Sequence, residues 1–125
     1  VALSKAGKLP GKLYIQFVMG VQNAMPADKN IFNYYVETVK RLAPQAEWCA
    51  AGIGRHQNTL NEWSIAAGGH ARTGLEDNIR LDKSTLARSN AALVARTAEI
   101  CHSHSRPVAT WHEARSLLGL KEVNL

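Results

Sequence analysis

The chain has 125 residues and a mass of 13.7 kDa, a size that fits one ordinary domain or a large piece of a bigger one. Hydrophobic residues make up 46% and charged residues 20%, which excludes a disordered or collagen-like chain, and no apolar run approaches the ~18 residues of a membrane span. Fifteen Lys and Arg against ten Asp and Glu give a formal net charge of +5, but the basic residues are scattered, so we expect no nucleic-acid partner.

Strand and helix patterns alternate along the chain. Short, nearly continuous apolar runs predict strands buried on both faces of a parallel sheet, and apolar residues three and four positions apart predict helices. The predicted elements are, in order, a strand over 13–19, a helix over 30–43, a strand over 48–53, a helix over 60–67, a strand over 70–75, a helix over 89–101, and a helix over 110–119 followed by a frayed tail to residue 125. Pro44 stops the first helix and Gly68 closes the second. Ser89 is the expected N-cap of the third, and Thr110 with Glu113 has capping-box spacing.

This order of elements predicts an α/β fold with a parallel sheet, made of about three strand–helix units and a terminal helix. Neither G-x-G-x-x-G nor the phosphate-binding G-x-x-x-x-G-K-[ST] pattern is present, so the common nucleotide-binding folds lose their best evidence. A complete (β/α)8 barrel needs about 250 residues. A chain of 125 residues would be about half of one.

The densest group of polar residues covers 70–78, with the sequence HARTGLEDN. Side chains alternate along a strand, so Arg72, Gly74 and Glu76 would share one face, with Gly74 leaving room for a ligand or metal. Asp77 has the other parity but follows the strand end, where parity no longer sets its direction. Carboxylates at the carboxyl end of a parallel strand lie where α/β barrels build active sites. One can ligate a divalent metal while its neighbour acts as a general base.

A structural role is the alternative for the same residues. Arg72 and either carboxylate would form an ion pair that ties the strand end to its loop, and Asp77 with Asn78 would begin a turn. His56 and Gln57 follow the second strand and would reach the same rim of the sheet. Alternatively, they would cap the next helix or form hydrogen bonds within the loop. Spacing alone leaves both alternatives open.

The cellular setting follows from the N-terminal region and the cysteines. The first twelve residues mix three lysines with glycine and proline and lack the apolar core of a signal peptide. Cys49 and Cys101 are far apart and match no Cys-x-x-Cys pattern, which excludes a disulfide scaffold. We therefore expect a cytoplasmic protein with no membrane partner.

Residues 68–81, with the sequence GGHARTGLEDNIRL, closely resemble the beta-keto acid cleavage enzyme family, which includes 3-keto-5-aminohexanoate cleavage enzyme. Other segments agree with this family in the same order along the chain: 16–21, 48–57, 86–91 with Val94, 107–110 and 113–115. The match spans essentially the whole chain, and the Arg-x-Gly-Leu-Glu-Asp-Asn string is specific.

The resemblance implies a zinc-dependent TIM barrel of which this chain is the C-terminal part. The implied reaction converts a β-keto acid and acetyl-CoA into acetoacetate and a new acyl-CoA. By resemblance, Glu76 ligates the zinc together with a His-x-His pair, Asp77 is the general base, and Arg72 positions or stabilises the anionic substrate. The candidate substrate contacts are His56, Gln57 and Asn78.

The chain departs from the family pattern because it has no His-x-His pair at a strand end. His102 and His104 have the right letters, but they end the third predicted helix, where cations are favoured. Two other functions therefore stay open: a non-catalytic barrel fragment that persists by association, and a basic module that binds an acidic partner. Three parallel strands leave two unpaired edges, so we expect a homo-oligomer.

Overall fold

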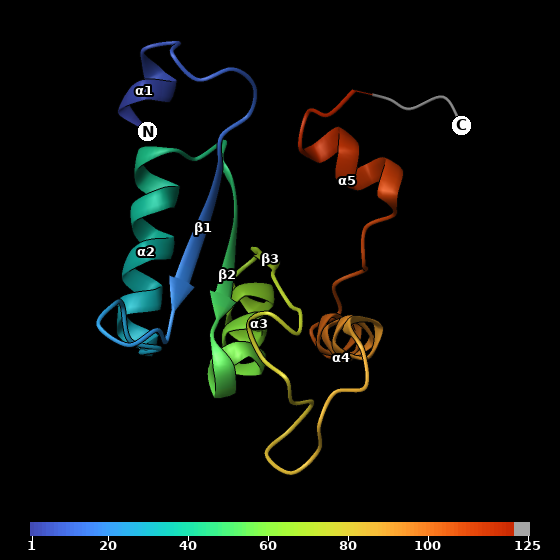
Figure 1. The fold of residues 1–125 in the computed structure, drawn as a ribbon. Helices are drawn as coiled ribbons and strands as arrows, with labels where there is room; N and C mark the ends of the chain where they lie inside the picture. Colours follow the sequence, from blue (N-terminus) through green and yellow to red (C-terminus); the bar gives the residue numbers. More distant parts are fainter. Residues whose placement is uncertain (122–125) are drawn as a thin grey trace.

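A computed structural model describes residues 1–121 and has three parallel strands that alternate with helices (Figure 1). Its elements are α1 (Ala2–Lys5), β1 (Tyr14–Met19), α2 (Lys29–Leu42), β2 (Glu47–Gly52), the short 3₁₀ helix η1 (Gly54–His56), α3 (Gln57–Ala66), β3 (His70–Ala71), α4 (Asn90–Ser103) and α5 (Trp111–Leu117). The predicted α/β class and the order of its elements are confirmed. Most of the predicted tail, residues 122–125, lies outside the described residues.

The sheet has the strand order β1-β2-β3, and both neighbouring pairs are parallel. Tyr14 lies beside Glu47 at the start of the first pair, and Met19 lies beside Gly52 at its end. Because all three strands run the same way, their carboxyl ends meet at one edge of the sheet. The loops that follow the strands therefore start close together.

The hydrophobic core lies on one side of the sheet, against α2 and α3. Along β1, Phe17 and Met19 are buried, whereas Tyr14 and Val18 are 43% and 42% exposed. The core consists of buried apolar residues from β1, β2 and these two helices: Phe17, Met19, Phe32, Val36, Val39, Trp48, Ala50 and Leu60. The prediction that β1 is buried on both faces is wrong for the described chain, because helices cover only one of its faces.

The third strand is shorter than predicted. It covers only His70 and Ala71, not residues 70–75. A turn replaces the ladder, because the carbonyl oxygen of Gly74 accepts hydrogen bonds from the N–H groups of Asp77 and Asn78, at 3.2 and 3.1 Å. The predicted strand alternation therefore stops before Glu76, which lies in the turn.

The helix ends follow the side-chain caps that the sequence offers. Asp28 accepts bonds from the N–H groups of Asn30 and Ile31, so α2 begins one residue earlier than predicted. The Ser89 cap of α4 and the Thr110 capping box of α5 are confirmed. The short α1 was not predicted, and α5 stands away from the sheet with no buried residue (Figure 1).

Over residues 1–121, no helix combines the length and apolar character that crossing a membrane would require.

Candidate active site

The loops that leave the three strands gather at the carboxyl edge of the sheet. Backbone bonding joins two of them directly, because the N–H of Gly54 after β2 donates to the carbonyl oxygen of Asp77 after β3, at 2.6 Å. In open α/β sheets, ligands bind in the crevice outside the carboxyl ends of the strands. This edge also carries most of the residues that the sequence singled out.

Arg72 and Asp77 form a two-fold ion pair at this edge. The Nε of Arg72 donates to Oδ2 of Asp77 at 2.7 Å, and its Nη2 donates to Oδ1 at 2.8 Å. The Asp77 side chain is only 5% exposed, so the pair is shielded from water on the carboxylate side. The hydrogen bonds to Asp77 raise the pKa of Arg72, which keeps the guanidinium charged. The sequence left open whether Arg72 pairs with Glu76 or with Asp77, and in the structure its hydrogen-bonded partner is Asp77.

Glu76 is left open beside this pair. Its side chain is 89% exposed, and its Oε1 lies 4.0 Å from Nη2 of Arg72, a contact that contributes little in water. Over residues 1–121, no three His, Cys, Asp or Glu side chains gather into a metal site. Because the Glu76 side chain is exposed and makes only one weak contact, it is free to act as one ligand of a metal. That role stays a prediction.

Gln57 holds the loop that carries these residues. It is fully buried at the start of α3. Its Nε2 donates to the carbonyl oxygen of Gly74 at 3.0 Å, and its Oε1 accepts from the hydroxyl of Thr73 at 3.0 Å. Asn90 at the start of α4 adds a third bond by accepting from the N–H of Leu75 at 2.8 Å. The geometry matches the structural alternative for Gln57, hydrogen bonding to a loop, and contact with substrate stays a prediction.

His56 and Asn78, the other predicted substrate contacts, lie in different places. His56 packs against Gly20, where an added Cβ would lie 2.8 Å from Cδ2 of His56 and where φ is +85°. Asn78 closes a turn by donating to the carbonyl oxygen of Arg80 at 2.5 Å and accepting from its N–H at 3.1 Å. Asn78 faces the same groove as Glu76 and Asp77, whereas His56 lines a separate hollow beside the loop after β1.

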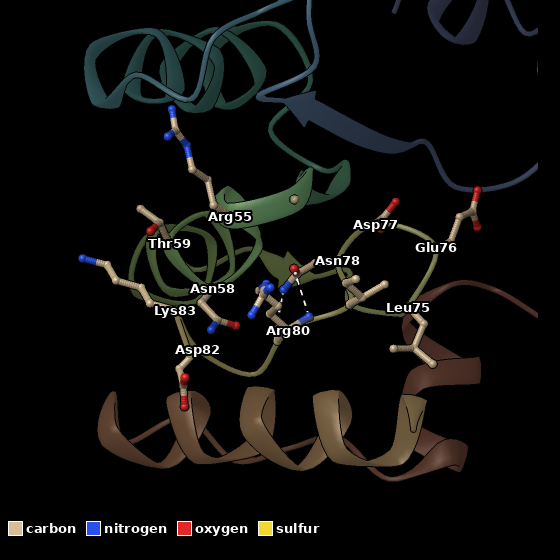
Figure 2. A pocket seen from close by; sticks show the side chains of 12 residues that line it. Arg55, Asn58, Thr59, Leu75, Glu76, Asp77, Asn78, Arg80, Asp82 and Lys83 are labelled. Carbon is tan, nitrogen blue, oxygen red and sulfur yellow. Dashed lines mark hydrogen bonds between the residues drawn. The ribbon is translucent and has the colours of Figure 1, made fainter. Parts of the chain in front are cut away.

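A groove of about 760 Å³ runs over the loops after β2 and β3 (Figure 2). Its lining residues are Gly54, Arg55, Asn58, Thr59, Leu75, Glu76, Asp77, Asn78, Ile79, Arg80, Asp82 and Lys83. Sequence reasoning found the carboxylates of this groove but missed its cations, Arg55, Arg80 and Lys83. Arg55 lies just after β2, which was the one available signal, whereas Arg80 and Lys83 lie well beyond the end of β3. Scattered single cations do not stand out in a chain with a net charge of +5.

The His102 and His104 pair lies away from this edge. His102 is in the last turn of α4, and His104 is its C-cap. The Nε2 of His104 lies 3.8 Å from Oε1 of Glu62 on α3. Their predicted place at a helix C-terminus is confirmed.

Comparison with known proteins gives the class to which this fold and site belong. The family model for the beta-keto acid cleavage enzyme matches residues 1–120. The chain therefore belongs to the beta-keto acid cleavage enzyme family, as the resemblance of residues 68–81 indicated.

Curated relatives are named for reactions of β-keto acids. The chain is 58% identical over 125 residues to the 3-oxoadipate:acetyl-CoA acetyltransferase of Cupriavidus necator, a match that covers 100% of this chain and 44% of that enzyme. It is 35% identical over 122 residues to the 3-keto-5-aminohexanoate cleavage enzyme of Fusobacterium nucleatum, covering 98% of this chain and 43% of that enzyme. The chain thus spans less than half the length of these relatives.

Proposed function

We propose that the complete protein containing this chain converts a β-keto acid and acetyl-CoA into acetoacetate and a new acyl-CoA, in a zinc-dependent reaction. Residues 1–125 would be a partial domain, the C-terminal part of its TIM barrel. The observation that carries the proposal is the Asp77 carboxylate, held at the carboxyl edge by Arg72 and followed by an open groove. Membership of the family supports it along 120 residues of the chain.

The one-sided core supports the barrel. In a doubly wound sheet, helices cover both faces, whereas a barrel strand turns one face to the helices and the other to the barrel interior. Phe17 and Met19 of β1 are buried against the helices, and Tyr14 and Val18 point the other way and are exposed. On β1 this is the pattern expected of a barrel strand whose remaining neighbours lie in the rest of the protein, whereas β2 is buried on both faces from Trp48 on.

Asp77 and Arg72 can divide the work of the reaction. Each oxygen of Asp77 accepts one N–H from Arg72, which fixes the plane of the carboxylate and leaves a lone pair on each oxygen for a proton. The charged Arg72 would stabilise negative charge on the keto oxygen. In the balanced reaction, two bonds would break, the C2–C3 bond of the keto acid and the bond between the acetyl carbon and the sulfur of acetyl-CoA. Two bonds would form, one between C2 and the acetyl carbon and one between C3 of the released acyl group and the CoA sulfur.

This chain would supply only part of the ligand set of a zinc ion. Glu76 offers an exposed carboxylate of the kind that binds zinc, but the described residues contain no complete cluster of ligands. The His ligands implied by the resemblance would come from outside this chain. When bound, zinc would polarise the keto oxygen as a Lewis acid.

Product analysis of the complete protein tests the proposal. 3-Oxoadipate is the first substrate to try, because the relative that is 58% identical over the whole chain is named for it. We expect acetoacetate and succinyl-CoA when acetyl-CoA is present and neither product when it is omitted. The proposal is wrong if no acetoacetate forms from 3-oxoadipate, 3-keto-5-aminohexanoate, 3,5-dioxohexanoate or 3-dehydrocarnitine, the substrates named for the relatives.

A further inference from the structure

Three cationic side chains line the groove beside the candidate active site: Arg55, Arg80 and Lys83, called here the cationic cluster. Over residues 1–121, none of the three takes part in an ion pair. The side chain of Arg55 makes a hydrogen bond of 3.4 Å to its neighbour His56. Because these cations line one groove and make no ion pair with a carboxylate of the described residues, they attract an anion that enters it.

Two of the three carboxylates in the same groove, Asp77 and Asp82, make hydrogen bonds outside the cationic cluster, whereas Glu76 is exposed. Asp77 is bound by Arg72 through both of its oxygens. The Oδ1 of Asp82 accepts three bonds in its own turn, from the N–H and hydroxyl of Ser84 and the N–H of Thr85, at 2.8 to 2.9 Å. These bonds lower the pKa of Asp82 to about 2, so it stays negatively charged, and the turn holds its Oδ1 in place. Among the residues that line the groove, it offsets one of the three cationic charges.

Charge is unevenly distributed along the groove, because cations outnumber carboxylates at one end and carboxylates outnumber cations at the other. Figure 2 shows Arg55 and Lys83, with Asp82 near Lys83, on one side and Glu76 and Asp77 on the other, with Arg80 between them. A ligand that follows the groove would place one end at the candidate catalytic carboxylates and an anionic end among the cations.

We propose that the cationic cluster binds the phosphate groups of the CoA moiety of acetyl-CoA; this inference rests on the proposed function. CoA carries its phosphates at one end and its thioester at the other, separated by the long pantetheine arm. The apolar side chains of Leu75 and Ile79, which also line the groove, suit that arm. A β-keto acid also carries a carboxylate next to its reacting carbons, and 3-oxoadipate carries a second one at C6. The several phosphate charges of CoA suit a cluster of three cations better than a single carboxylate does, and the experiment separates the two ligands.

Calorimetric titration of the complete protein with free CoA tests this assignment without needing turnover. We expect the Arg55→Ala/Lys83→Ala double variant to bind CoA at least about tenfold more weakly, because charge-assisted contacts to phosphate are lost. The Arg55→Lys/Lys83→Arg variant keeps both charges and is expected to bind within about threefold of the wild type. The matched control is Lys40→Ala, which removes an exposed lysine in the last turn of α2, outside the groove, and should leave binding unchanged.

Two further measurements distinguish binding of the CoA phosphates from binding of the carboxylate of the β-keto acid. 3′-Dephospho-CoA should lose less affinity than CoA when the cations are removed, and the KM for the β-keto acid should stay within about twofold in the double variant. The assignment is overturned if the double variant binds CoA as the wild type does, if Lys40→Ala weakens binding as much, or if only the KM for the β-keto acid rises. A protein that binds CoA through these residues yet forms no acetoacetate would refute the proposed function alone.

Discussion

At the scale of single residues, the site depends on how one carboxylate is held. Asp77 is almost fully buried, and both of its oxygens face the same guanidinium. A pair of this kind is rigid, because the planar fork of Arg matches a carboxylate in two places at once. The pair serves a structural role by itself, so only the loss of turnover can show that Asp77 also moves a proton.

Replacing Asp77 with Asn in the complete protein separates these two roles. The change is nearly isosteric and keeps one acceptor for Arg72, so we expect the protein to stay folded and to keep its zinc. Turnover should fall by about 10²–10⁴-fold, the usual contribution of a general base. Steady-state kinetics and thermal unfolding measure both effects, with Asp82→Asn in the same groove as the matched control. Turnover within about threefold of the wild type, less than ~1 kcal/mol of barrier, would place the base elsewhere.

Glu76 gives a separate prediction because its side chain is exposed and makes one weak contact. Glu76→Gln should leave the fold intact but lower the zinc content of the complete protein, since an amide is a poorer ligand than a carboxylate. Metal analysis of the purified protein measures this, with the exposed Glu99→Gln on α4 as control. An unchanged zinc stoichiometry removes Glu76 from the metal site.

At the scale of elements, side chains from two helices, α3 and α4, hold the turn after β3 in place by hydrogen bonds. Gln57 bonds to Thr73 and Gly74, and Asn90 bonds to Leu75. A buried polar side chain that satisfies both of its ends in this way fixes the loop against the sheet edge, because leaving either partner unpaired costs about 1–3 kcal/mol. The position of Arg72 and Asp77 therefore depends on a residue of the preceding helix.

Gln57→Leu tests this dependence. The turn should open more readily, so the amide hydrogens of Asp77 and Asn78 are expected to exchange at least about tenfold faster, which corresponds to ~1.4 kcal/mol of lost local stability. Hydrogen-exchange mass spectrometry on the complete protein provides the measurement. Gln45→Leu, which changes an exposed glutamine before β2, should leave these amides unaffected. Equal exchange in Gln57→Leu and the wild type would mean that other contacts hold the turn.

The strength of the local signals decided what the sequence could predict. Apolar periodicity and caps such as Ser89 and Thr110 act within a few residues, so the order and class of the elements were readable. The turn at Gly74 was not, because it depends on a hydrogen bond from Gln57, seventeen residues away. The cationic cluster was missed for the same reason, since Arg55 and Lys83 line one groove only when two loops fold onto one edge of the sheet.

At the scale of the whole molecule, the chain has a face that needs a partner. Tyr14 and Val18 of β1 are about two-fifths exposed on the side of the sheet away from α2, and β1 and β3 each have one edge with no strand beside it among the described residues. Relatives are more than twice as long as this chain. The remaining strands of a barrel would cover both the face and the edges.

The isolated 125-residue chain is therefore expected to self-associate, to bind zinc weakly and to leave β-keto acids unchanged. One carboxylate cannot replace the three protein ligands of a catalytic zinc site, and exposed strand edges favour association. Size-exclusion chromatography with metal analysis and a turnover assay measures all three properties, with the complete protein as control. A monomer that carries one equivalent of zinc and cleaves substrate contradicts the partial-domain account.

Isotope tracing through the complete protein tests the central claim most directly. The protein is supplied with 3-oxoadipate and with acetyl-CoA that carries carbon-13 at both acetyl carbons, and the products are separated and analysed by mass spectrometry. If C2 of the keto acid joins the acetyl group, both labelled carbons appear in acetoacetate, as its C3 and C4, and the succinyl-CoA is unlabelled. Label in the acyl group of succinyl-CoA, or labelled acetate without acetoacetate, would contradict the cleavage reaction to which Arg72, Glu76 and Asp77 are assigned.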